Sequence, residues 1–296
     1  MATVQELRTR VRAITNTRKL TKAMELVASA RLRRAQERIE AMRPYADRML
    51  ELMAGTARAS ASVRSLPLLQ RREVRTAAIV PVTGDRGLAG AFNAQILRRS
   101  TALYAELESQ GVTVRWLPVG RKGISTLRFS RFELEAQWGG FSDNPHYHDA
   151  QAIAHRLSEL YSEGTVDRVV LVYNHFVSAL VQHVTVSDVL PIPEHVLETS
   201  DEERDRDRLV GDFIFEPEPE QILERLLPVY LETEIYRALL ESAASEQGAR
   251  MTAMRNASKS AGELIDTLTL EMNRARQAEI TQEILEVVAG ADALTA

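Results

Sequence analysis

Apolar side chains recur at alternating spacings of three and four residues along the first part of the chain. A repeat of this kind, sustained over many turns, predicts a helix that packs against a partner in a left-handed coiled coil. We therefore expect residues 4–57 to form one helix, which Pro44 bends locally without ending it. The stripe consists of Val4, Leu7, Val11, Ile14, Arg18, Thr21, Glu25, Ala28, Leu32, Ala35, Ile39, Met42, Ala46, Met49 and Met53.

Three polar residues, Arg18, Thr21 and Glu25, interrupt the apolar character of this stripe. At the same level the apolar side chains, Met24 among them, move to another face of the helix. Two helices in a coiled coil share only the stripe. We therefore expect the face that carries Met24 to contact something other than the partner helix.

A second stripe of the same spacing runs through the last part of the chain and predicts a helix over residues 219–288, with a kink at Pro228. Together the two helices are expected to form one antiparallel coiled coil. Beyond Ala275 the stripe falls on polar residues, so the end of the helix is predicted to extend past its partner. There the apolar side chains shift to Ile280, Ile284, Val287 and Val288.

The middle of the chain has a different pattern, and 15 of the 16 aromatic residues lie between Phe92 and Tyr236. Short apolar runs with strand propensity alternate there with helical periodicity, which favours an α/β fold with a doubly wound, mostly parallel sheet. We expect residues 1–66 to form the N-terminal helix, 67–216 the α/β domain and 217–296 the C-terminal helix. Strands are predicted over 76–82, 111–120, 132–138, 167–174, 183–192 and 212–216, and helices over 92–109, 122–128 and 150–161.

Charge is distributed unevenly, because residues 1–64 carry +8 and residues 211–296 carry −9, within a total of −4. Oppositely charged ends suit an antiparallel pair of helices, while the overall acidity disfavours a nucleic-acid partner. With no cysteine, the chain has no disulfide, thiolate zinc site or cysteine nucleophile. No run of 18 apolar residues and no leader pattern occurs, so we expect a cytosolic chain.

Motifs of catalysis are missing from the sequence. The glycine turn GDRGLAG at 84–90 follows a predicted strand, but it has neither dinucleotide-binding nor P-loop spacing, so we interpret it as a plain turn. No nucleophile elbow of the form G-x-S-x-G occurs. The residues His146, His148, Asp149 and His155 lack the spacing of a known metal motif, and a solvated loop is favoured over a metal site. We expect no cofactor.

Three segments resemble the gamma subunit of F-type ATP synthase: ITNTRKLTKAMELVASARLRRAQ at 14–36, DRGLAGAFN at 85–93, and the run from SEQGARM to GADAL at 245–294. The resemblance implies a non-catalytic rotor subunit whose coiled-coil shaft stands inside a ring of three alpha and three beta subunits. It also implies a base that sits, with the epsilon subunit, on the membrane ring of c subunits. The chain would then be a peripheral part of a complex at the cytoplasmic face of the plasma membrane.

The resemblance also implies roles for individual residues. Met24, Arg250, Arg276, Gln277 and Thr281 are expected to contact the beta subunits. Phe215 and Glu216 are expected to face the c ring, and the apolar side chains from Ile280 to Val288 to turn in an apolar sleeve.

The sequence departs from the family pattern at a few positions. Ala89 stands where family members often have cysteine, and Ser258, Lys259 and Ser260 where Thr, Asp and Asn are frequent. Two other functions remain open on the residues alone. One is an α/β enzyme or small-molecule-binding protein with a coiled-coil arm for oligomerisation, and the other is a basic arm that binds RNA. The missing catalytic motifs and the apolar tip favour the rotor.

Overall fold

The computed structural model describes residues 3–58, 66–197 and 218–295, without the side chains of residue 195 and residues 291–295. Its contacts divide the chain into two compact units. We call Met1–Ala28 with Arg250–Ala296 the helical unit, and Ser29–Ala249 the α/β unit. The predicted strand at 212–216, together with Phe215 and Glu216, lies outside the described residues.

Two long helices run through both units. Helix α1 spans Val4–Arg58 and α6 spans Pro219–Thr295, each without a break at its internal proline. Pro219 suits the start of α6, because the backbone N–H groups in the first turn of a helix have no partner within the helix, so the missing N–H of proline costs no hydrogen bond. The predicted bounds of 4–57 and 219–288 are therefore close, although α6 continues for seven residues more.

Within the helical unit the two helices run antiparallel. Arg255 Nε of α6 lies 3.1 Å from Glu25 Oε1 of α1, and a Cβ on Gly262, further along α6, would lie 3.5 Å from Arg18 Cζ, earlier in α1. Burial follows the predicted stripe except at Arg18, which is exposed; the other two polar members, Thr21 and Glu25, are buried at 8% and 7% exposure. The helices thus keep their packing phase through the polar interruption.

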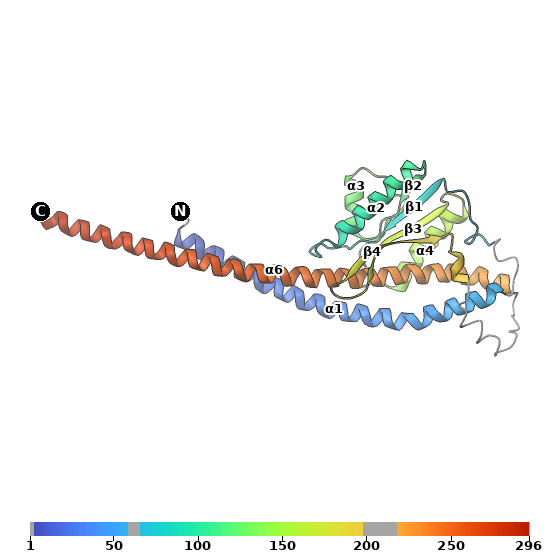
Figure 1. Ribbon diagram of the computed structural model, residues 1–296, viewed down its shortest axis with the longest axis horizontal. Helices are drawn as coiled ribbons and strands as arrows, with labels where there is room; N and C mark the ends of the chain where they lie inside the picture. The colour runs from blue at the N-terminus through green and yellow to red at the C-terminus, as the bar shows by residue number, and fades with distance from the viewer. Residues whose placement is uncertain (1–2, 59–65, 198–217, 296) are drawn as a thin grey trace. The chain divides into compact units, whose positions relative to one another are not determined.

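A four-stranded sheet forms the centre of the α/β unit, in the order β2-β1-β3-β4 (Figure 1). The strands are β1 (Thr76–Pro81), β2 (Thr113–Trp116), β3 (Arg168–Phe176) and β4 (Gln182–Leu190). The first three pair in parallel and β4 pairs antiparallel with β3. This confirms the predicted α/β fold with a mostly parallel sheet.

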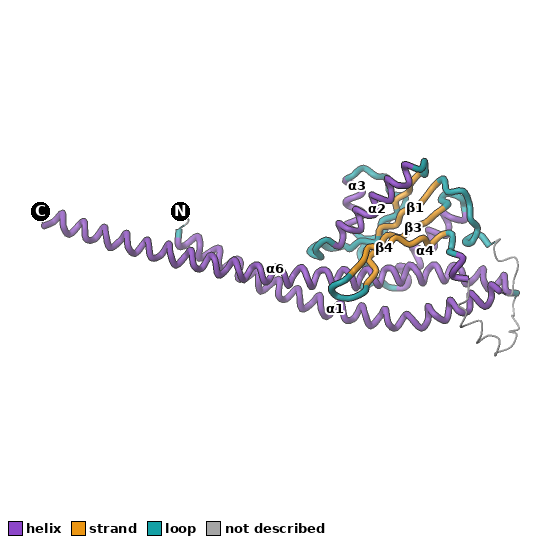
Figure 2. Tube along the Cα trace, viewed as in Figure 1, coloured by secondary structure: helices purple, strands orange, loops and turns teal. Residues whose placement is uncertain are grey.

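Helices cover both faces of that sheet (Figure 2). On one face Ala77 and Ile79 pack with α2 (Phe92–Ser109) and α3 (Arg121–Phe129). On the other, Ala78 and Val80 pack with α4 (Tyr147–Ser162), α6 and the end of α1. Successive strand residues alternate between the two cores, as the period of two in a strand requires. The sheet is therefore doubly wound, as predicted.

The prediction of an edge strand over 132–138 was wrong. The segment touches the β2 region at two isolated bridges, Leu134 with Trp116 and Trp138 with Val119. Glu135 N donates to Trp116 O at 2.9 Å, and Trp138 N donates to Pro118 O at 3.1 Å. Between these two hydrogen bonds the segment advances by three residues while its neighbour advances by two. The segment therefore holds one residue too many for a regular ladder, and the strand pairing is interrupted.

Candidate interaction surfaces

The C-terminal end of α6 packs against no other segment of the part of the chain that the structure describes. Every side chain from 276 to 290 is exposed, and we call this stretch the tip. Four of its apolar side chains, Ile280, Ile284, Val287 and Val288, are 47, 58, 72 and 52% exposed. Contiguous exposed apolar residues mark a surface that another molecule covers.

The tip also carries three of the residues expected to contact a partner, and they share a face with the apolar ones. At about 100° per residue, Arg276, Gln277 and Thr281 lie with those four side chains inside an arc of roughly 140°. Thr281 Oγ1 donates to Gln277 O at 2.8 Å, which fixes the hydroxyl against the helix. The structure thus brings these seven predicted residues onto one surface, which we call the tip face.

The two other predicted contact residues lie elsewhere in the helical unit and are less accessible. Met24 is half-buried, and Arg250 is 7% exposed. Only the tip residues therefore present fully open side chains in this conformation.

A basic groove in the helical unit is a surface that the sequence analysis did not find. It has a volume of about 720 Å³, and Glu25 forms its acidic floor, accepting from Lys22 Nζ at 2.9 Å and Arg255 Nε at 3.1 Å. Hydrogen bonds from Lys22 and then Arg255 hold the pKa of Glu25 below its ordinary value. The cationic residues along the groove are Arg18, Lys19, Lys22, Arg255 and Lys259.

Ser258 and Lys259, two of the residues named above as departures from the family pattern, both line this groove. Lys259 adds a cation to a surface that also holds Arg18, Lys19, Lys22 and Arg255. A signal was present in the sequence: Arg18, Lys19 and Lys22 are spaced so that they share one side of a helix.

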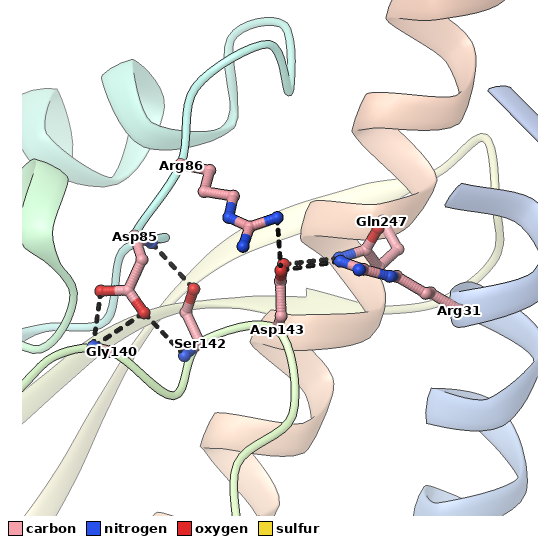
Figure 3. Close-up of polar contacts among 7 residues, drawn as sticks. All are labelled: Arg31, Asp85, Arg86, Gly140, Ser142, Asp143 and Gln247. Carbon is pink, nitrogen blue, oxygen red and sulfur yellow. Dashed lines mark hydrogen bonds and ion pairs between the residues drawn. The ribbon is translucent and has the colours of Figure 1, made fainter. Parts of the chain in front are cut away.

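The glycine turn at 84–90 is held by its own chain. Gly84 N donates to Asn93 Oδ1 and Asp85 N to Ser142 Oγ, both at 2.8 Å. The carboxylate of Asp85 accepts the backbone N–H groups of Gly140 and Ser142 at 2.9 Å (Figure 3). It also accepts the backbone N–H of Arg121 at 3.0 Å. Burial alone would raise the pKa of Asp85, but these backbone donors outweigh it and lower the pKa.

The histidine cluster lies partly on a helix and not wholly in the expected loop. His148 and Asp149 belong to the first turn of α4, where Asp149 Oδ2 accepts the backbone N–H of His146 at 2.7 Å. His148 Nε2 is 3.2 Å from Asp149 Oδ1, and His155 pairs with Glu159 at 3.2 Å. Asp149 therefore caps a helix. Among the described residues, no three His, Cys, Asp or Glu side chains lie together as metal ligands would.

A family model described as ATP synthase matches residues 3–294. The ATP synthase gamma chain of Rubrobacter xylanophilus is 45% identical over 298 aligned positions that cover the whole of both chains. The chain belongs to the gamma-chain family of ATP synthases. The gamma chain of a Synechococcus species is likewise 44% identical over 99% of each chain.

Solved structures agree with this membership in the gamma-chain family. A chain in the structure of the central stalk and c ring of Tetrahymena thermophila mitochondrial ATP synthase is 30% identical, with a TM-score of 0.59 over 81% of this chain and 99% of that one. A chain of the Euglena gracilis mitochondrial ATP synthase has a TM-score of 0.69 at 18% identity, over 98% and 94% of the two chains, which shows a shared fold. Within the described residues of this gamma-family chain, no helix has the length and hydropathy needed to cross a bilayer.

Proposed function

We propose that this chain is the central rotor stalk of a proton-translocating ATP synthase, transmitting torque between a c ring and three catalytic beta subunits. The observation that carries the proposal is the tip. A helix that stays continuous while all its side chains are exposed needs a surrounding partner, because its apolar residues lose contact with water only in a complex. Full-length membership of the gamma-chain family supports the same assignment.

The proposed partners follow from this role. Alpha and beta subunits surround the helical unit, while residues 67–216 form the rotor base, where Phe215 and Glu216 face the c ring beside the epsilon subunit. Residues 1–66 and 217–296 supply the two shaft helices. The chain binds the membrane only through the c ring, at its cytoplasmic face, and needs no cofactor or active site of its own.

In this role the chain acts by asymmetry. A contact that is equally strong with all states of a beta subunit shifts none of them. Moving a two-state equilibrium from 1:99 to 99:1 requires a differential of about 5.5 kcal/mol. The tip face occupies one side of α6 only, so its orientation determines which beta subunit receives the contacts of Arg276, Gln277 and Thr281. Met24 and Arg250 add contacts further down the shaft.

The contact that we propose for Met24 has its own test. Met24→Lys places a long cation on a half-buried apolar surface. In the assembled enzyme this change is expected to lower protons pumped per ATP more than assembly yield. An equal loss of both would identify Met24 as a packing residue of the helix pair.

Reconstitution tests the function itself. The purified chain alone is expected to hydrolyse no ATP, whereas adding it to alpha and beta subunits should yield a complex whose three beta subunits differ in nucleotide occupancy. With the membrane sector present, ATP hydrolysis should then drive proton pumping. Hydrolysis by the chain alone, or a complex whose beta subunits are unaffected by it, would contradict the rotor assignment.

A further inference from the structure

The carboxylate of Asp143 lies where three segments of the α/β unit meet (Figure 3). Arg31 of α1 donates Nη1 to its Oδ2 at 2.7 Å, and Gln247 of α6 donates Nε2 to its Oδ1 at 3.0 Å. Arg86 of the glycine turn places Nη1 3.5 Å from Oδ2. One side chain therefore joins both long helices to the turn that follows β1.

The loop that carries Asp143 is fixed to the sheet by the neighbouring acidic residue. Asp85 accepts the N–H groups of Gly140 and Ser142 at 2.9 Å, and Ser142 Oγ accepts Asp85 N at 2.8 Å. Gly140 has a φ of +102°, which favours glycine, and a Cβ on Gly139 would lie 3.1 Å from Asp85 Oδ1. Both glycines thus allow the loop to close on Asp85, and this closure sets the position of Asp143.

The loop contacts α1 a second time, one residue after Asp143. Arg38 donates to Asn144 Oδ1 and to Pro145 O, and its Nη2 donates to Tyr236 OH of α6 at 3.0 Å. Arg31 and Arg38 are seven residues apart, which places them on the same side of α1. The loop therefore contacts α1 over two turns and α6 at Gln247, with Asp143 as its charged member.

Burial strengthens the Asp143 contacts. Gln247 is 1% exposed and the Asp143 side chain is 25% exposed, so water and salt screen the carboxylate less than a surface ion pair. Hydrogen bonds to an ionised acceptor are stronger than neutral ones. By comparison, Asp188 makes an equally close pair with Arg168 at 2.6 Å, but that pair lies within the β3–β4 hairpin. Two of the three Asp143 contacts described above reach the long helices.

We propose that Asp143 is a positioning residue that locks the α/β unit to α1 and α6 against rotation of the helices relative to the sheet. This inference rests on the proposed rotor function and deepens it. If torque passes between base and shaft, the load crosses the interface between the sheet and the two helices. Apolar packing alone resists sliding weakly, because it is non-directional, whereas charge-assisted hydrogen bonds fix direction. Asp143 provides that directional contact.

The test compares Asp143→Ala and Asp143→Asn with the matched control Asp188→Ala, in the full enzyme reconstituted with its partner subunits in vesicles. At equal assembly, protons pumped per ATP are expected to fall with Asp143→Ala, to fall less with Asp143→Asn, and to stay unchanged with Asp188→Ala. A purely structural role would lower assembly and melting without changing this ratio.

A second measurement covers variants that assemble poorly. The chain has no native cysteine, so a thiol-reactive spin label attaches only where a cysteine is introduced. We place the two labels at Arg34→Cys in α1 and at Gln137→Cys before the loop. In the isolated chain, Asp143→Asn should increase the population with a longer label distance by about tenfold, since a charge-assisted hydrogen bond contributes roughly that factor or more.

The outcomes separate two failures. Should the unaltered chain fail to support ATP-driven pumping, the proposed function fails. Should it pump normally while Asp143→Ala pumps equally well at equal assembly, only the locking role fails. An unchanged label distance in Asp143→Asn would also contradict that role.

Discussion

Helix α6 is packed differently in the two units. In the α/β unit all residues from 238 to 248 are buried, because the helix is enclosed by the sheet, α1 and the 139–145 loop. In the helical unit, from 251 to 275, burial shrinks to one stripe facing α1, and from 276 to 290 it disappears. A single continuous helix is thus first part of a core, then one helix of a coiled coil, and finally exposed on all sides. The difference teaches that stability and recognition are carried by separate stretches of one element.

The largest expected effect tests where stability lies. Leu157 of α4 is fully buried in the core that includes α6, so Leu157→Ala should lower the free energy of unfolding by about 2–5 kcal/mol. The matched change Ile284→Ala on the tip should cost under about 0.5 kcal/mol, because that side chain is 58% exposed among the described residues. Denaturant titration measures both. Similar losses of unfolding free energy at the two positions would contradict the claim that stability comes from the core and not from the tip.

A smaller effect is expected at the turn that positions the 139–145 loop. Asp85→Asn puts an amide N–H₂ against the N–H of Gly140 or Ser142, so it should cost roughly 1–3 kcal/mol at neutral pH. The folded pKa of Asp85 is lowered below 3.8, so its contribution is complete above that value and is lost as pH falls through the folded pKa.

Melting curves at neutral and strongly acidic pH check this prediction. The difference between the native chain and Asp85→Asn should shrink in acid. Glu73→Gln is the control, because that carboxylate is 77% exposed and pairs with Arg75 on the surface. A difference that stays constant with pH would show that Asp85 acts by shape rather than by charge.

Much of this contrast was visible in the sequence. The spacing of three and four residues predicted both stripes and the end of the second at Ala275, because helical packing depends on local periodicity. The sequence also marked Glu25 as an interruption. That Glu25 stays buried could not be predicted, since its carboxylate is held by Arg255, which is 230 residues away in the chain.

The contacts of Asp143 could not be predicted from the sequence for the same reason. Its contacts come from positions 31, 86 and 247, and no local pattern links them. Likewise, the alternation at 132–138 indicates a strand, but the extra residue between its two hydrogen bonds depends on the partner strand. The exposure of the tip residues could be predicted because it follows from the broken stripe. That they contact a partner stays a prediction from the family resemblance.

A third prediction sharpens the role of the polar interruption. Glu25→Leu restores an apolar stripe, and the two cations it leaves behind, Lys22 and Arg255, are each 58% exposed and stay hydrated, so no buried charge loses its partner. Amide hydrogen exchange over residues 20–28 and 251–262 should therefore slow or stay unchanged, whereas Glu25→Ala should accelerate it. Glu263→Ala, at an exposed pair 4.0 Å from Lys259, should leave exchange unaltered. Faster exchange in Glu25→Leu would mean that the ion pair itself holds the helices.

The smallest effect on stability should accompany a large effect on function. Arg276 and Gln277 are exposed, and side chains of this kind contribute little to folding, so their joint replacement by Ala should change the free energy of unfolding by under about 0.5 kcal/mol. In the assembled enzyme the same change removes a guanidinium and an amide from the tip face. Guanidinium groups bind carboxylates through forked hydrogen bonds, and alanine leaves those partner groups unpaired.

The control for this last prediction uses the opposite face of the same turns. Glu279 and Gln282 are equally exposed, but at about 100° per residue they lie outside the roughly 140° arc of the tip face. Replacing both by Ala should leave protons pumped per ATP unchanged, while Arg276→Ala/Gln277→Ala lowers it. If both double variants lowered protons pumped per ATP equally, the partners would respond to the size of the tip and not to its face. A loss confined to the tip face would mean that its orientation is the signal, because a helix that contacts its surroundings alike on all sides distinguishes no direction of rotation.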